Sequence, residues 1–267
     1  MTRTLVTGAT GTLGTALRPR LVAAGHTVCA ASRNPPDEPD NDIEWVELDL
    51  TNSQGINTSL DDVDIVIHAA TAPQGDTEAV DVRGTKRLLE AAKEAGVKHF
   101  LYPSIVGINE IPFSYYEHKS VAEKAVEASD VPATIVHATQ FYSFVVELLD
   151  YVAKLPVWPL PTKMQVQPID VAEVAGVIVD YATLEATGRT DPVGGPAVHS
   201  IGELAQVYRD VHSLRRPIVR VPLPGGTAAS FRAGYATCPE YTVGTLTWKE
   251  WLTERHASNI ERASPRP

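Results

Sequence analysis

Two adjacent tyrosines and a lysine, in the segment SYYEHKS at residues 114–120, are the first side chains that could carry acid–base chemistry. A free phenol has a pKa of about 10, so it serves as a proton donor or acceptor near neutrality only when a nearby cation favours its phenolate. At about 100° per residue, Tyr115 and Lys119 share one helical stripe with Val126, whereas Tyr116 falls on the flank. The pattern predicts that Tyr115, not Tyr116, is the proton donor.

The same segment has a second interpretation, a helix surface without chemistry. Lys119 and Glu123 are four residues apart, which suits a solvent-exposed ion pair on one helix. A packed but inert Tyr115 phenol is a third interpretation. The choice depends on what the rest of the fold places beside Tyr115.

Three glycines in TGATGTLG, residues 7–14, follow a short apolar run and precede a helical pattern. Gly8 permits a tight turn, Gly11 lets the backbone approach a pyrophosphate, and Gly14 lets helix and strand pack closely, while the start of the helix offers free N–H donors. The spacing therefore predicts a dinucleotide-binding loop, and a tight turn without a ligand is the alternative. The predicted cofactor-binding residues are Gly8, Thr10, Gly11, Thr12, Leu13 and Gly14.

The end of the second predicted strand, ASRNP at residues 31–35, bears on which dinucleotide fits. An NAD-preferring site usually places an acid there, and that acid would repel a 2′-phosphate. Here Arg33 can form a bidentate contact with a 2′-phosphate and Ser32 can donate a second hydrogen bond, so NADP(H) is favoured over NAD(H). A solvated Arg33 is the alternative, and three acids just downstream could soften the preference: Asp37, Glu38 and Asp40.

The elements that must position these residues follow an alternating pattern. Strand-like runs are predicted at residues 3–8, 26–32, 43–50, 63–70, 98–104 and 132–138, and helical segments at 12–24, 53–60, 76–95 and 114–129. Such alternation predicts an α/β fold with a doubly wound parallel sheet, the Rossmann type. We expect residues 1–138 to form the dinucleotide-binding core. Residues 139–267, which are richer in Pro and Gly, should complete the sheet and form a small substrate-side annex.

Composition narrows the class of ligand. The chain has 267 residues and a net charge of −10, which disfavours nucleic acid and anionic membranes as partners and favours a small-molecule substrate. Cys29 and Cys238 are far apart and lack histidines at metal-ligand spacing, so neither a disulfide nor a metal site is expected. With no apolar run long enough for a membrane span, we expect a cytoplasmic monomer or homodimer.

These motifs together resemble the short-chain dehydrogenase/reductase superfamily, in its atypical or extended NmrA-like branch. The resemblance spans nearly the whole chain. It rests on the glycine pattern at 7–14, LDL at 48–50, HAA at 68–70, RGTKRLLEAAKEAGVKHFLYPS at 83–104, YxxxK at Tyr115 and Lys119, ATQF at 138–141 and QPIDVAEVA at 167–175.

The resemblance implies roles for further residues. Asp49 and Leu50 would flank the adenine, and Ala69, Ala70 and Thr71 would line the ribose side of the cofactor. Ser104 would polarise the substrate oxygen, Tyr115 would transfer the proton, and Lys119 would hold the nicotinamide ribose and lower the pKa of the tyrosine. The chain departs from the pattern at Asp81, where extended relatives usually have Asn, and at His137, where NmrA-like relatives often have Arg.

The substrate pocket is predicted in the turn after the sixth strand and in the Pro-rich loop. Aromatic residues there would suit a small, largely uncharged carbonyl, quinone or enone, although each could instead be a core residue beneath the loop: Phe141, Tyr142, Phe144 and Trp158. The expected function is an NADP(H)-dependent oxidoreductase. A non-catalytic NmrA-like redox sensor and an epimerase-like enzyme are the alternatives.

Overall fold

The computed structural model describes residues 1–37 and 42–263, and these form two compact units. The first unit contains residues 1–109, 113–137 and 171–191. The second contains residues 110–112, 138–170 and 192–267. Both units therefore include segments that are distant in the sequence.

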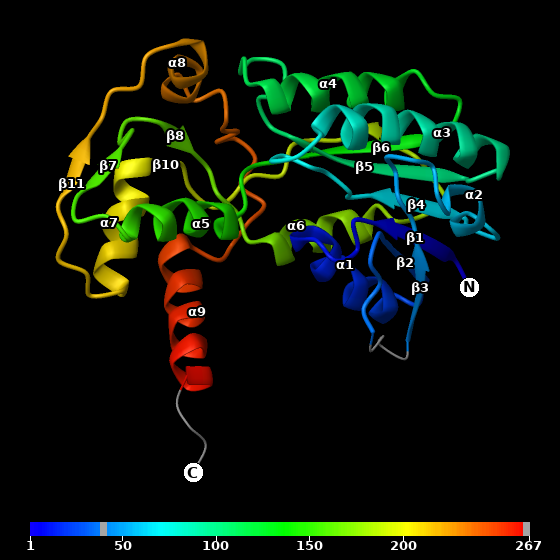
Figure 1. The fold of residues 1–267 in the computed structure, drawn as a ribbon, viewed down its shortest axis with the longest axis horizontal. Helices are drawn as coiled ribbons and strands as arrows, with labels where there is room; N and C mark the ends of the chain where they lie inside the picture. Colours follow the sequence, from blue (N-terminus) through cyan, green and yellow to red (C-terminus); the bar gives the residue numbers. More distant parts are fainter. Residues whose placement is uncertain (38–41, 264–267) are drawn as a thin grey trace. The chain divides into compact units, whose positions relative to one another are not determined.

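The first unit is built on a seven-stranded sheet (Figure 1). Its strands are β1 (Arg3–Thr7), β2 (Thr27–Ser32), β3 (Ile43–Glu47), β4 (Ile65–His68), β5 (His99–Ile105), β6 (Ala133–Ala138) and β9 (Gly188–Arg189), in the spatial order β3-β2-β1-β4-β5-β6-β9. Parallel ladders join β3 to β2, β2 to β1, β1 to β4, β4 to β5, and β6 to β9. The order reverses at β1, as in doubly wound sheets, so the predicted fold class is confirmed.

Helices cover both faces of this sheet, as Figure 1 shows. They are α1 (Thr12–Ala23), α2 (Ile56–Ser59), α3 (Thr85–Glu94), α4 (Ser114–Glu127) and α6 (Val171–Asp180), with a π-helical segment η1 (Glu78–Gly84) leading into α3. The bounds of the first six strands agree with the sequence pattern to within a few residues.

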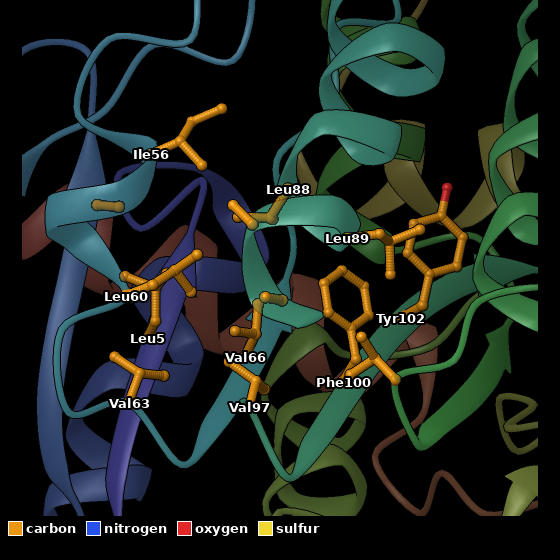
Figure 2. Close-up of a cluster of buried hydrophobic side chains, with 14 of the residues drawn as sticks. Leu5, Ile56, Leu60, Val63, Val66, Leu88, Leu89, Val97, Phe100 and Tyr102 are labelled. Atoms are coloured by element: carbon orange, nitrogen blue, oxygen red, sulfur yellow. The ribbon is translucent and has the colours of Figure 1, made fainter. Parts of the chain in front are cut away.

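The core on the α3 and α4 face is formed by strand residues that alternate along the pleat (Figure 2). Leu5, Val66 and Phe100 extend from three neighbouring strands toward Leu88 of α3. Successive strand side chains point to opposite faces, and the neighbouring residues Val6, Ile67 and Leu101 are buried as well, so both faces of these strands are covered. Strands that are buried on both faces need apolar residues at nearly every position, which explains the continuous apolar runs in the sequence.

The seventh strand and α6 come from residues 171–191, which follow a long segment of the second unit. Helix α6 packs beside α1, and Thr134 and Ile135 of β6 pair with Gly188 and Arg189 of β9. A strand of two residues has no periodicity in the sequence, which is why the pattern predicted six strands.

Over its described residues, the second unit combines four helices with short strand pairs. Its elements are α5 (Tyr142–Ala153), β7 (Trp158–Leu160), β8 (Gln165–Val166), β10 (His199–Ser200), α7 (Ile201–Val211), β11 (Ile218–Arg220), α8 (Gly226–Arg232) and α9 (Trp248–Ala263). Strand β7 pairs with β11 in parallel, and β8 pairs with β10 in antiparallel. Across the part of the chain that the structure describes, none of the helices combines the length and apolar character needed to cross a membrane.

Candidate active site

The glycine-rich loop joins β1 to α1, and its glycines have separable roles. Gly8 has φ of +64°, and a Cβ there would lie 2.7 Å from the backbone of Ala70, while a Cβ on Gly14 would lie 2.3 Å from the Gly8 carbonyl oxygen. Gly11 differs, because a Cβ there would meet only the Gly8 carbonyl oxygen, at 3.2 Å. The fold itself therefore requires Gly8 and Gly14, whereas the bare backbone at exposed Gly11 leaves room for a ligand.

Helix α1 begins at Thr12 without a side-chain cap. The first N–H groups of a helix have no partner within the helix, so uncapped donors at this end are available to an anion. Thr10 and Thr12 are exposed beside them, whereas Leu13 is buried. The loop thus offers backbone donors and hydroxyls to a pyrophosphate.

The end of β2 lies next to this loop. The Thr10 and Ser32 hydroxyl oxygens are 3.5 Å apart, and the Ser32 oxygen accepts a hydrogen bond from the Asn34 N–H at 3.2 Å. Arg33 is exposed and lies within electrostatic reach of Asp49, whose pKa is lowered first by hydrogen bonds from Thr51 and then by the Arg33 charge. The predicted acids Glu38 and Asp40 lie outside the described residues.

The segment after β4 connects the glycine loop to the predicted proton donor. Ala70 packs against Gly8, and the next residue, Thr71, places its Oγ1 2.9 Å from the Tyr115 hydroxyl. Thr71 Oγ1 also donates to Asp81 Oδ1 at 2.6 Å, and the Ala72 N–H donates to Asp81 Oδ2 at 3.0 Å. Because the single Thr71 proton goes to the Asp81 carboxylate, Tyr115 is the donor to Thr71.

Tyr115 is held as a neutral phenol in this arrangement. Burial raises its pKa above the ordinary value, and the charge of Asp81 adds to the rise. A hydrogen bond from Thr71 would oppose the rise only if Thr71 turned its proton from Asp81 to the phenolate. The net shift is upward, so Tyr115 keeps its proton throughout the neutral range. The expectation that Lys119 lowers the pKa of this tyrosine is therefore wrong for this structure, because burial dominates.

Lys119 lies one helical turn beyond Tyr115 and is almost wholly buried. Its Nζ donates to the Pro103 carbonyl oxygen at 3.1 Å and lies 4.2 Å from the centre of the Tyr102 ring. Burial lowers the pKa of Lys119 to about 8, although the charges of Asp81 and Glu123 act to raise it. An ammonium carries three N–H donors, so one carbonyl bond leaves capacity for a ligand hydroxyl.

Ser104 belongs to a different set of contacts. Its hydroxyl donates to Glu123 Oε2. The same carboxylate oxygen lies 3.0 Å from His137 Nε2. The other oxygen, Oε1, accepts a hydrogen bond from Arg189 of β9 at 2.6 Å. Burial alone would raise the pKa of Glu123, but the hydrogen bonds from His137 and Ser104 and the charge of Arg189 outweigh it, and the net shift is downward. The structure thus joins Tyr115 to Thr71, and Ser104 to Glu123.

The orientation of α4 corrects one expectation from the sequence. Tyr116, expected on the flank, is buried with 6% of its surface exposed, whereas Tyr115 is partly exposed. The buried stripe includes Tyr116, Lys119 and Glu123, spaced three and four residues apart, so the stripe is rotated toward Tyr116. Tyr115 is in the first turn, where its ring extends toward Thr71. The alternative of a solvated Lys119–Glu123 pair is also excluded, because both side chains are buried.

The other predicted residues lie in several environments. Leu50 is buried in the core of the first unit, and Asp49, Ala69 and Ala70 are partly buried. In the second unit Tyr142 and Trp158 are core residues, with the Tyr142 hydroxyl donating to the Leu246 carbonyl oxygen. Phe141 is partly exposed and Phe144 is exposed. Contact of these aromatic residues with a substrate remains a prediction.

Three residues at this site have no role in the sequence prediction. In that prediction Asp81 is a departure from the family pattern, Glu123 is a surface partner of Lys119, and Tyr102 is assigned nothing. The Tyr102 hydroxyl is buried without a hydrogen-bond partner in the described chain, and its ring lies under the Lys119 ammonium. Its place two residues before Ser104 on β5 puts both side chains on the α4 face, which is the signal that could have found it.

These features fit a dinucleotide with a nicotinamide ribose near Lys119. The bare backbone at Gly11, the uncapped start of α1 and the remaining Lys119 donors are features that a ligand could use. Among the residues with described side chains, no cluster of three or more histidines, cysteines or acids could hold a metal ion.

Comparisons with known proteins agree with this arrangement. A family model described as NAD(P)H-binding matches residues 8–183. The photosystem II assembly factor Ycf39 of Guillardia theta is 25% identical, with 97% of this chain and 86% of that protein covered. The ceramide reductase of Caulobacter vibrioides is 27% identical, with 82% of this chain and 74% of that protein covered.

Solved structures show the same fold. MoeE5, described in complex with UDP-glucose and NAD, superposes with a TM-score of 0.77 at 19% identity, covering 98% of this chain and all of that one. The epimerase Mth375 of Methanothermobacter thermautotrophicus gives a TM-score of 0.75 at 17% identity, covering 98% and 95%. The chain therefore belongs to the NAD(P)H-binding family, and its motifs resemble the short-chain dehydrogenase/reductase superfamily.

Proposed function

We propose that this protein is an NADP(H)-dependent oxidoreductase that reduces a small carbonyl, quinone or enone. The observation that carries the proposal is the continuous contact from the glycine loop to the phenol: Gly8 abuts Ala70, and the adjacent Thr71 holds the Tyr115 hydroxyl. A proton donor is thereby attached to the segment that lines the cofactor loop. A protein that only binds a dinucleotide has no need of that attachment.

Each residue has a defined task in this chemistry. When bound, the reduced nicotinamide supplies a hydride to the carbonyl carbon. Tyr115 transfers its hydroxyl proton to the carbonyl oxygen, and Thr71 can then rotate its own proton from Asp81 toward the phenolate. The Lys119 ammonium stabilises that phenolate and holds the ribose hydroxyls. Because the pKa of Lys119 is about 8, the reduction rate should fall as pH rises through that value.

The preference for NADP(H) rests on the end of β2. The exposed Arg33 provides guanidinium donors there and Thr10 a hydroxyl. The Ser32 hydroxyl donates to the Asn34 carbonyl oxygen at 3.1 Å. The nearby acid Asp49 already accepts hydrogen bonds from Thr51 N and Oγ1 at 2.8 and 2.7 Å. A 2′-phosphate would meet the Arg33 guanidinium and the Thr10 hydroxyl, which supports NADP(H) over NAD(H). Ser32 would join them by turning its proton away from Asn34.

The test has two parts, run on the purified protein. NADPH and NADH are titrated by fluorescence, and NADPH consumption is followed with aldehydes, ketones, quinones and enones. Tighter NADPH binding together with turnover of one class supports the proposal. Equal affinity for the two dinucleotides contradicts the cofactor assignment, and absence of turnover across all four classes contradicts the enzymatic role.

A non-catalytic sensor of the NADP(H) redox state is the second candidate, and one observation favours it. The Ser104 proton is donated to the buried Glu123, so the hydroxyl is not free to donate to a substrate oxygen unless that bond breaks. Ser104→Ala separates the two functions. In an enzyme that uses Ser104, turnover falls while NADPH binding is kept, whereas in a sensor the change affects only stability.

A further inference from the structure

Helix α5 has two apolar faces, of which only one is used by its own unit. The first face packs in the core of the second unit through Tyr142, Val145, Val146, Leu149 and Val152. The second face carries large side chains that are 58%, 40%, 70% and 40% exposed, respectively: Phe144, Leu148, Tyr151 and Leu155. Leu155 follows the helix end, and its N–H donates to the Val152 carbonyl oxygen at 3.0 Å, which continues the helical turn.

The spacing of the exposed side chains is that of a helix–helix seam. Phe144, Leu148, Tyr151 and Leu155 are separated by four, three and four residues, so they form one stripe less than 90° wide on a helix of 3.6 residues per turn. Isolated exposed apolar residues are common on soluble proteins, but a contiguous stripe marks an interaction surface. The stripe is therefore expected to have a partner.

The charges beside the stripe indicate which partner fits. Glu147 and Lys154 are both exposed, lie on the same side of the stripe and are seven residues apart. When two copies of α5 pack antiparallel about a two-fold axis, Leu148 faces Tyr151 of the second copy, and Glu147 faces Lys154 of the second copy. The symmetry produces each contact twice.

A parallel pair of helices would not give this complementarity. In that arrangement Glu147 would lie beside position 152 of the second copy, and Val152 is already buried in the core of its own unit. The antiparallel pair is thus the arrangement in which this stripe meets an apolar surface and both flanking charges meet opposite charges.

We propose that the exposed face of α5 is a homodimer interface in which two copies pack antiparallel, with two reciprocal Glu147–Lys154 ion pairs. The occupant is a second copy of this chain, chosen by the self-complementary charge pattern. A four-residue stripe with flanking charges is small, so the dimer should dissociate at concentrations on the order of micromolar.

Sedimentation velocity across a concentration series, without any ligand, tests the proposal. Leu148→Asp should give a monomer with unchanged circular dichroism, because Leu148 lies outside the core of its own unit. Glu147→Lys and Lys154→Glu, each made alone, should weaken the dimer about tenfold, because each replaces two attractive pairs by two repulsive pairs. Lys163→Glu, an exposed charge reversal outside α5, is the matched control and should leave dimerisation unchanged.

The charge reversals also test the register. An equimolar mixture of the Glu147→Lys and Lys154→Glu proteins should recover the dimer as a heterodimer, and the double variant should recover it as a homodimer. Three results would overturn the proposal: a native protein that is monomeric at about 100 µM, a dimer that survives Leu148→Asp, or single reversals whose mixture associates no better than either alone. None of these readouts depends on cofactor binding or turnover.

Discussion

Lys119→Met is expected to stabilise the protein at neutral pH while weakening dinucleotide binding. Lys119 is almost wholly buried, and burial lowers its pKa from an ordinary 10.5 to about 8. At about 1.4 kcal/mol per pKa unit, holding this charge in the folded state costs about 3 kcal/mol below pH 8. Methionine has similar length and no charge, so the variant removes that cost and loses only the contacts with Pro103 and the Tyr102 ring.

The gain should depend on pH in a defined direction. Below about pH 8 the lysine is protonated in both states, and the full cost is present in the native protein. Between about pH 8 and 10.5 the unfolded state binds more protons than the folded state, so the stability of the native protein rises with pH. The advantage of Lys119→Met should therefore shrink across this window.

Urea unfolding at pH 6.5, 8 and 9.5 measures this difference, since the other titrating groups are shared by both proteins. Lys124→Met on the exposed face of the same helix is the control, and its effect should be small at every pH. A burial cost on the Lys119 charge is refuted if Lys119→Met lowers the stability at all three pH values, or raises it by an amount that does not change with pH. A parallel NADPH titration should show weaker binding by Lys119→Met, because the ribose then loses its donor.

Tyr115→Phe should keep NADPH binding and lower turnover by about 10² to 10⁴, whereas Tyr116→Phe should be mild in steady-state assays; equal rates for Tyr115→Phe and the native protein would show that the phenol only packs. Arg33→Ala should lose about 1.5–3 kcal/mol of NADPH affinity and little NADH affinity, and an equal loss for both in titrations contradicts the 2′-phosphate role. Gly11→Val should fold normally, since a Cβ there meets only one atom at 3.2 Å, yet bind neither dinucleotide; retained binding would move the site elsewhere. Asp81→Asn should shift the alkaline limb of the pH–rate profile to lower pH, because the Asp81 charge raises the pKa of Lys119, and an unmoved limb excludes that coupling.

Local patterns in the sequence were sufficient for much of the fold. The first six strands, α1, α4 and the glycine loop were predicted because strand burial, helical periodicity and tight turns depend on residues close together in the chain. The role of Gly8 follows from the same logic, since its positive φ is a local requirement. The prediction that Tyr115 rather than Tyr116 lies on the buried stripe with Lys119 was wrong, because Tyr116 is buried and Tyr115 is partly exposed.

Contacts between distant segments were decided only by the tertiary structure. β9 has two residues, and it is a strand because β6 pairs with it. Tyr116 is only 6% exposed because of how α4 is rotated about its own axis on the sheet. Helical periodicity predicts that rotation only approximately, so it does not decide which of two adjacent residues faces the core. Whether Glu123 is a surface ion-pair partner or a buried acceptor depends on Ser104, His137 and Arg189, which are 14 to 66 residues away. Burial and the partners of a charge are properties of the packed molecule, because desolvation is set by all the neighbours that folding brings together.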